Sequence, residues 1–141
     1  MGRYSVDTSA FPFVVVNCEG SIDDAAFRVY LESLVELLNR GTRYAVVIDA
    51  TAASTPSPKQ RKMQADYNRE ERERLKRLCV CIAFVIPSPL LRGALTAIFW
   101  LQPLPCEHRV CAKRVDADAW VRERLQAADG SASATAARPS G

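Results

Sequence analysis

The sequence predicts an α/β fold in which a single mixed, mostly parallel sheet of five strands is combined with about four helices, in the order β-β-α-β-α-β-α-β-α. Two observations predict this fold. Unbroken apolar runs stand at residues 13–16, 44–48 and 79–86, and segments with helical periodicity separate them. Strands that alternate with helices form a mostly parallel sheet with right-handed crossovers, because each helix returns the chain to the start of the next strand.

The first half of the chain predicts two strands, a helix and a third strand. Residues 4–6 and 13–18 form the first two strands, and the second of these is rich in β-branched valine. A helix is predicted over residues 24–39, because its apolar side chains recur at intervals of three and four. These side chains are Phe27, Tyr30, Leu31, Leu34, Val35, Leu37 and Leu38. Residues 44–48 form an apolar strand typical of a sheet covered on both faces, and Asp49 ends it.

The second half of the chain predicts three helices and two strands. Two of the helices begin at the dipeptides Ser57-Pro58 and Ser88-Pro89. Serine caps a helix N-terminus well, and proline fits the first helical position because the N–H that it lacks has no partner there. The helices are predicted over residues 57–78, 90–101 and 116–125, and the strands over residues 79–86 and 109–112.

Residues 1–126 are predicted to form one domain, followed by a disordered tail, rich in alanine and serine, over residues 127–141. The composition is that of an ordinary globular protein, with 48% hydrophobic and 25% charged residues. The five cysteines are odd in number and no secretory leader precedes them, which predicts free thiols and a cytoplasmic location. Neither they nor the single histidine, His108, show the paired spacing of zinc ligands, so neither a metal nor a cofactor is expected.

The positive charge of the chain is concentrated on one predicted helix. The formal net charge is +3, and residues 57–78 hold eight basic and four acidic side chains. The two signs are interleaved, which indicates a solvated face crossed by ion pairs; contact with a protein or with an anionic membrane surface is the alternative. Sequence-specific nucleic-acid binding is not expected, because no recognition-helix pattern accompanies the charges.

The helix predicted over residues 90–101 is apolar on several sides, although a helix that covers a sheet needs only one apolar stripe. It is too short to be transmembrane, since it reaches only about 20 Å across a hydrocarbon core of about 30 Å. Its surplus side chains either pack beneath residues 102–106 or form an exposed patch for a partner. We expect an interaction surface that combines three parts of the chain: the helix over residues 90–101, the loop at residues 50–57, and the start of the helix that begins at Ser57. Its candidate residues are Asp49, Ser54, Ser57, Lys59, Arg92, Phe99 and Trp100.

Three stretches, residues 45–49, 55–61 and 83–94, resemble the STAS domain, the family of the anti-sigma-factor antagonists. The likeness covers about residues 4–125 and is closer to a subgroup of uncharacterised bacterial proteins, described as STAS-like with kinship to the lipid-binding CRAL-TRIO fold. In antagonist-type STAS domains a serine at the start of the helix after this strand is a phosphorylation switch. The resemblance places that serine at Ser57, or less closely at Ser54. The turn here lacks the acidic residue and the glycine of the family pattern.

The sequence therefore predicts a non-catalytic regulatory or scaffolding module that binds another protein or a second copy of itself. His108 has no predicted catalytic partner, and no phosphate-binding loop or dinucleotide fingerprint is present. Asp49 is interpreted as a residue that orders the chain after it by accepting backbone N–H groups. Two alternatives stay open: a carrier or sensor that holds a lipid or other apolar molecule between the third helix and the sheet, and a regulator switched by phosphorylation of Ser57.

Overall fold

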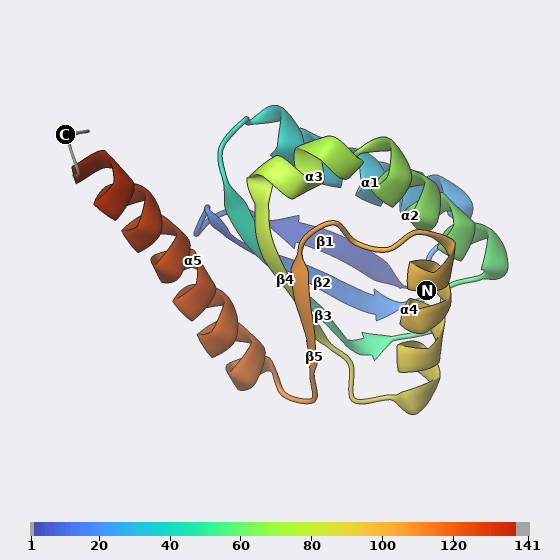
Figure 1. Cartoon of the computed structure of the whole chain (residues 1–141). Coiled ribbons are helices and arrows are strands. Elements are labelled where there is room, and N and C mark those ends of the chain that lie inside the picture. The colour runs from blue at the N-terminus through green and yellow to red at the C-terminus, as the bar shows by residue number, and fades with distance from the viewer. Residues whose placement is uncertain (1, 138–141) are drawn as a thin grey trace.

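Residues 2–137 of the protein form an α/β sandwich of five strands and five helices (Figure 1). A computed structural model describes residues 2–137, and it describes side chains as far as residue 129. The strands are β1 (Arg3–Asp7), β2 (Phe13–Gly20), β3 (Tyr44–Ala53), β4 (Cys79–Val85) and β5 (Glu107–Cys111). The helices are α1 (Asp24–Asn39), α2 (Pro58–Glu70), α3 (Arg72–Leu78), α4 (Pro89–Leu101) and α5 (Arg114–Ala137).

The five strands form one sheet in the order β1-β2-β3-β4-β5, so the strands lie in the order in which they occur along the chain. Strand β1 is antiparallel to β2, and the other three pairs are parallel. The register across the parallel part aligns Val15 with Val47, Val47 with Ala83, and Ala83 with Arg109. The predicted fold class, a mixed and mostly parallel five-stranded sheet, is confirmed.

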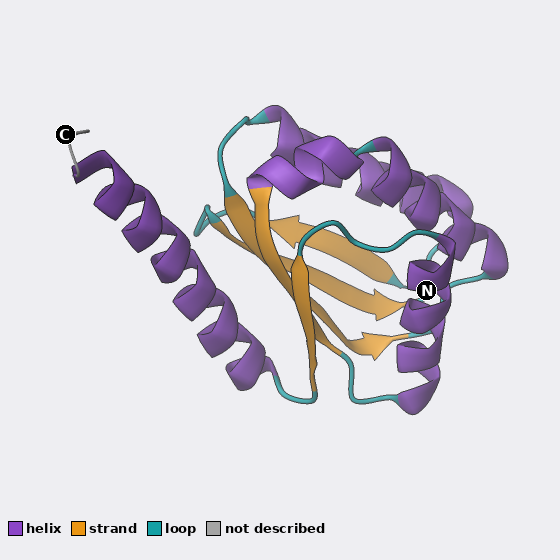
Figure 2. Ribbon diagram, in the orientation of Figure 1, coloured by secondary structure: helices purple, strands orange, loops and turns teal. Residues whose placement is uncertain are grey.

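Two hydrophobic cores lie on opposite faces of the sheet. On β2, Val14 and Val16 belong to the core under helices α1 to α4, and Val15 belongs to the core under α5. Successive side chains of a strand point to opposite faces, so strands covered on both faces are apolar at every position. Figure 2 shows the uneven coverage that results, with α5 alone on its side of the sheet and the other helices on the opposite side.

The prediction of a single helix over residues 57–78 is wrong, because this segment forms two helices, α2 and α3, that meet at Glu71. The backbone of Glu71 leaves the helical region with φ −99° and ψ 12°, and its carboxylate binds the guanidinium of Arg74. The change of direction leaves Leu75 and Leu78 buried at the start of β4. The fifth helix, which the sequence analysis did not predict, therefore arises from a break and not from a new segment.

Strand β3 is longer than predicted and continues through Asp49 to Ala53. The prediction that the strand ends at Asp49 was wrong, because pairing with β2 continues as Glu19 opposite Ala52 and Gly20 opposite Ala53. A register shift in β2 between Asn17 and Glu19 lies within this extension. Only the second half of the predicted loop at residues 50–57 is therefore a loop.

The last helix also continues beyond its predicted end. Helix α5 spans Arg114–Ala137, whereas the sequence predicted an end at residue 125 and a disordered tail from residue 127. Alanine, which is frequent in this segment, has the highest helix propensity of the common residues and favours continuation of the helix. The final residues of the predicted tail, 138–141, lie outside the described residues.

Candidate functional site

Helix α4 is fixed to the end of strand β4 by its cap and by one arginine. The hydroxyl of Ser88 accepts a hydrogen bond from the backbone N–H of Leu91 (3.4 Å), and Pro89 begins the helix. Nε of Arg92 donates to the backbone carbonyl of Ile86 (2.7 Å). Arg92, one of the candidate surface residues, therefore positions the start of the helix. The predicted Ser-Pro helix start is confirmed.

The outer face of α4 is an exposed apolar strip. Leu90, Trp100 and Leu101 are 72%, 85% and 61% exposed. Gly93 and Ala97 lie between them on the same side, since the positions follow one another at intervals of three and four. A Cβ atom added to Gly93 would meet no other atom within 4 Å, so the middle of the strip is open. We call these five residues the α4 strip. The inward side of the helix is formed by Leu91, Ala94 and Ile98, all buried.

Phe99 does not share the surface of Trp100, although the sequence analysis placed both in one contact surface. The Phe99 ring is half-buried, with its centroid 5.9 Å from that of Phe84 and 4.8 Å from that of His108. His108 lies on the edge strand β5, and its imidazole makes no hydrogen bond to a carboxylate or thiol among the described residues. The one histidine thus packs on aromatic rings, and Phe99 holds α4 against the sheet.

Asp49 lies on the α5 face of the sheet, away from the other candidate residues. Its Oδ1 accepts hydrogen bonds from the backbone N–H of Thr51 (3.0 Å) and from the Thr51 hydroxyl (2.6 Å). Its Oδ2 lies 3.4 Å from the guanidinium of Arg114 on α5. Burial raises the pKa of this carboxyl, but the bonds from Thr51 and Arg114 outweigh burial, and the net pKa is lowered. Asp49 therefore orders β3 and anchors the first turn of α5.

Ser54, Ser57 and Lys59 gather around the start of α2, on the helix layer that includes α4. The hydroxyl of Ser57 accepts a hydrogen bond from the backbone N–H of Gln60 (3.1 Å), which confirms the predicted N-cap. The ammonium of Lys59 lies 3.2 Å from the carboxylate of Asp24 on α1. Helices α2 and α4 pack against each other on the same face of the sheet.

The Ser57 cap leads to a stability prediction. Replacing Ser57 by alanine is expected to lower the free energy of unfolding by about 1 kcal/mol, because the N–H of Gln60 loses its acceptor. Urea denaturation followed by circular dichroism measures the loss. Ser33→Ala, in the middle of α1, is the matched control and should be neutral. Ser57→Asp should retain most of the stability, since aspartate is an equally good cap. Equal stability of Ser57→Ala and the wild type would contradict the assignment.

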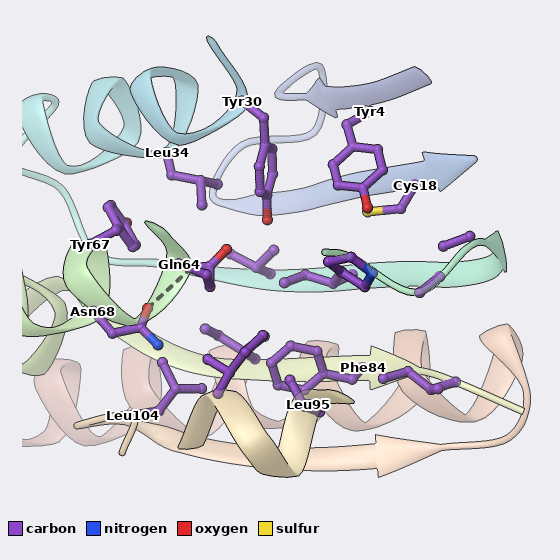
Figure 3. A pocket seen from close by; sticks show the side chains of 18 of the residues that line it. Tyr4, Cys18, Tyr30, Leu34, Gln64, Tyr67, Asn68, Phe84, Leu95 and Leu104 are labelled. Atoms are coloured by element: carbon purple, nitrogen blue, oxygen red, sulfur yellow. Dashed lines mark hydrogen bonds between the residues drawn. The ribbon is translucent and has the colours of Figure 1, made fainter. Parts of the chain in front are cut away.

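An apolar cavity of about 130 Å³ lies between the sheet and helices α1, α2 and α4 (Figure 3). The lining side chains labelled in Figure 3 are Tyr4, Cys18, Tyr30, Leu34, Gln64, Tyr67, Asn68, Phe84, Leu95 and Leu104. None of the residues that line it, all of them in the described part of the chain, carries a formal charge. Since an unfilled cavity costs roughly 24 cal/mol per Å³, leaving this one empty costs on the order of 3 kcal/mol.

Several buried polar side chains reach this cavity without a full set of hydrogen-bond partners among the described residues, and Tyr30 and Asn68 are two of them. Tyr30 is 7% exposed, and Figure 3 shows its hydroxyl pointing into the cavity, where it forms no hydrogen bond with a described residue. Asn68 is 2% exposed; its Oδ1 accepts from Nε2 of Gln64 (3.1 Å), while its Nδ2 donates to no described residue. Burial raises the pKa of Tyr30 well above its usual 10.0, so the hydroxyl stays neutral.

An aromatic cluster forms the wall at the β1 side of the cavity. The ring centroid of Tyr30 lies 5.3 Å from that of Tyr4 and 5.6 Å from that of Phe27, both in edge-on geometry. The thiol of Cys18 lies beside the Tyr4 hydroxyl in Figure 3. Burial is the main cause that raises the pKa of Tyr4 and of Cys18 to about 12 each. The wall is therefore uncharged at neutral pH.

The sequence analysis left open a carrier that holds an apolar molecule between the third helix and the sheet, but it did not identify the polar residues of this cavity. It predicted Tyr30 as an ordinary buried side chain of a helix, and it assigned no role to Gln64 or Asn68. The signal that marks the site is the pair Gln64 and Asn68, one helical turn apart and directed toward the core. Amide side chains at such positions need hydrogen-bond partners, which makes them visible against apolar neighbours.

Among the described residues, no three histidine, cysteine, aspartate or glutamate side chains are grouped so that they could hold a metal ion. None of the described helices combines the length and the apolar character needed to cross a membrane.

Comparison with known proteins shows the fold. No family model matches the sequence, and no curated protein matches it. The structure is similar to that of an uncharacterised DUF3478-family protein with a SpoIIAA-like fold from Shewanella loihica PV-4, with a TM-score of 0.60. The two sequences are 15% identical, and the alignment covers 85% of this chain and 93% of that chain. The structure is also similar to an anti-sigma factor antagonist from Mycobacterium paratuberculosis, with a TM-score of 0.56, 17% identity, and 86% and 95% covered. The chain has the SpoIIAA-like, or STAS-like, fold that the sequence resemblance predicted.

Proposed function

We propose that this protein is a non-catalytic interaction module that docks a protein partner through the α4 strip. The observation that supports this proposal is the exposure of Leu90, Trp100 and Leu101 on one side of a single helix. Large apolar side chains that gather on a surface mark interaction sites, whereas scattered ones do not. Tryptophan in particular is enriched among the residues that dominate binding energy.

A second copy of the chain is the partner that this surface fits first. The strip has a leucine near each end of the helix and small residues, Gly93 and Ala97, between them. An antiparallel copy related by a twofold axis would set Leu90 against Leu101 and Trp100 near the open position of Gly93. Small residues allow two helices to approach closely, so the same surface can serve on both copies.

The proposed dimer is weak and reversible. One helix face buries less than the roughly 800 Å² per partner of a standard interface. Phe99 and Asp49 are not part of the proposed surface, because Phe99 packs inward and Asp49 lies under α5.

The test is the oligomeric state. Sedimentation velocity over a dilution series should show the wild type associating with rising concentration, while the double variant Trp100→Gln, Leu101→Gln stays monomeric. Both side chains are exposed, so the variant should keep the circular dichroism spectrum of the wild type. Val29→Gln is the matched control: it is an exposed apolar residue of α1, 60% exposed, and should leave association unchanged.

Two results would contradict the proposal of a self-associating strip. One is a wild type that stays monomeric at the highest soluble concentration. The other is a double variant that still associates as the wild type does. If the wild type stays monomeric, the strip can still bind another protein. Labelled wild type that binds a purified partner no more tightly than the double variant does would then rule out the α4 strip as a docking surface.

A further inference from the structure

We propose that the cavity beneath α1, α2 and α4 is a binding site for a small, uncharged molecule with an apolar body the size of one aromatic ring and a single polar group. The site is separate from the α4 strip, since it is lined by the inward side chains of the same helix. The size of the cavity, its lack of charge, its unpartnered polar groups and its opening each restrict the ligand.

The volume sets the size of the ligand. The cavity measures about 130 Å³. An engineered apolar cavity of about 150 Å³ in another protein stays dry and binds benzene. The present cavity therefore takes a molecule of comparable size, and an extended acyl chain does not fit without movement of its walls. Aromatic rings at the wall, including Tyr4, Tyr30 and Phe27, suit the edge of a ring-shaped ligand.

The chemistry of the lining excludes a charged ligand. No lining residue is ionised at neutral pH, because the titratable groups there are tyrosines and cysteines such as Tyr4 and Cys18, whose pKa burial raises to about 12. An ion transferred from water into such surroundings would lose its hydration without gaining an opposite charge. A neutral ligand avoids this loss.

The polar group of the ligand is assigned to the side where Tyr30 and Asn68 lack partners. Polar groups inside proteins almost always have a hydrogen-bond partner, and here the Tyr30 hydroxyl, which points into the cavity, and the Asn68 Nδ2 have none among the described residues. The hydroxyls of Tyr44 and Tyr67, which also line the cavity, form no hydrogen bond with a described residue either. The Tyr30 hydroxyl and the Asn68 Nδ2 can each donate a hydrogen bond. A hydroxyl or carbonyl oxygen on the ligand would accept from one of them and leave the rest of the molecule in contact with apolar side chains.

The ligand can enter near the carboxyl end of β3. Ser54 is exposed to solvent and also lines the cavity, so the cavity reaches the surface between β3 and α2. Ala53 and Pro56, which flank Ser54, are half-buried lining residues. Ligands of open α/β sheets typically enter at the carboxyl ends of the strands.

The experiment uses benzene, phenol and benzoate as probes and methyl NMR spectra of the full chain as the readout. Benzene and phenol should shift the methyl signals of Leu91 and Ile98, which line the cavity on α4, in a saturable manner. Benzoate should cause no saturable shift, because its carboxylate would have to be buried without a partner. Tyr30→Phe should weaken phenol binding roughly two- to tenfold and leave benzene binding unchanged.

The second variant fills the cavity with a larger side chain. Ala94 is buried and lines the cavity, so Ala94→Leu should weaken binding of both probes by more than about tenfold. Ala97→Leu adds the same volume on the outer side of the same helix and should leave binding unchanged. If Ala94→Leu does not fold, Ala50→Val fills the cavity from strand β3 instead.

Three results would overturn the proposal: no saturable shift with benzene or phenol, benzoate binding as strong as phenol binding, or unchanged binding in the filled variant. None of them depends on the oligomeric state. Ala94→Leu should lose ligand binding and keep self-association. The double variant Trp100→Gln, Leu101→Gln should lose self-association and keep ligand binding. These two results together would separate the cavity from the α4 strip.

Discussion

Replacing Trp120 by alanine is expected to lower the free energy of unfolding by about 3–5 kcal/mol, the largest loss that we expect from a single side chain. Helix α5 alone covers its face of the sheet among the described residues, and Trp120 is its largest buried side chain, 8% exposed. The ring also lies under the guanidinium of Arg109, 4.9 Å from its centroid. Since natural domains are stable by about 5–15 kcal/mol, this loss removes a large share of the total.

Trp100→Ala is the matched control, because it removes the same side chain from an exposed position. At 85% exposure, Trp100 should contribute within about 0.5 kcal/mol to the stability of the monomer. Urea denaturation followed by circular dichroism, at a dilution where the protein is monomeric, compares the two. Equal losses in Trp100→Ala and Trp120→Ala would show that α5 does not cover the second core as described.

The second large effect is expected at alkaline pH. Burial is the main cause that raises the pKa of Cys18 and Cys81 from 9.0 to about 12, and that of Tyr4 from 10.0 to about 12. A group whose pKa is raised in the folded state stabilises the fold fully below its unfolded pKa, and this stability is lost as the pH rises toward the folded value. The free energy of unfolding should therefore fall between pH 9 and pH 12. One pKa unit corresponds to about 1.4 kcal/mol, so the ionisation of Cys18 alone is expected to lower the free energy of unfolding by on the order of 4 kcal/mol.

Urea denaturation at several pH values, in the presence of a reducing agent, measures this dependence. Cys18→Ala lacks one of the titrating groups, so its stability should fall less steeply with pH than that of the wild type. A free energy of unfolding that stays constant from pH 9 to pH 11 would mean that these thiols ionise as easily in the folded chain as in the unfolded one.

Local signals in the sequence predicted local structure well. The N-caps Ser57 and Ser88 were identified because a cap depends on residues within one helical turn. The strands were located because their apolar runs match a sheet covered on both faces. The end of β3 was placed wrongly, since Asp49 and Thr51 are typical of turns and only pairing with β2 keeps this segment extended. That pairing is a long-range contact, which composition does not show.

The candidate surface was only partly predictable for a similar reason. The sequence showed that α4 has more apolar residues than one face needs, and the exposed strip agrees with one of the two alternatives. It did not show which side is inward: Phe99 and Trp100 are neighbours in sequence, yet one packs on Phe84 and the other is exposed. The cavity was only partly predictable: Gln64 and Asn68 are amides directed toward the core, but an apolar side chain beside a void and one in a filled core have the same pattern in the sequence.

Helix α4 lies between the cavity on its inner side and the proposed docking surface on its outer side. Leu91 and Ile98 face the cavity, while Leu90 and Trp100 face solvent. Arg92 fixes the first turn of the helix at Ile86, and Phe99 packs the last turn against Phe84. A molecule that enters the cavity and shifts this helix would also move the surface offered to the partner. Thermodynamic linkage then requires the reverse: the partner must change the affinity for that molecule by the same factor.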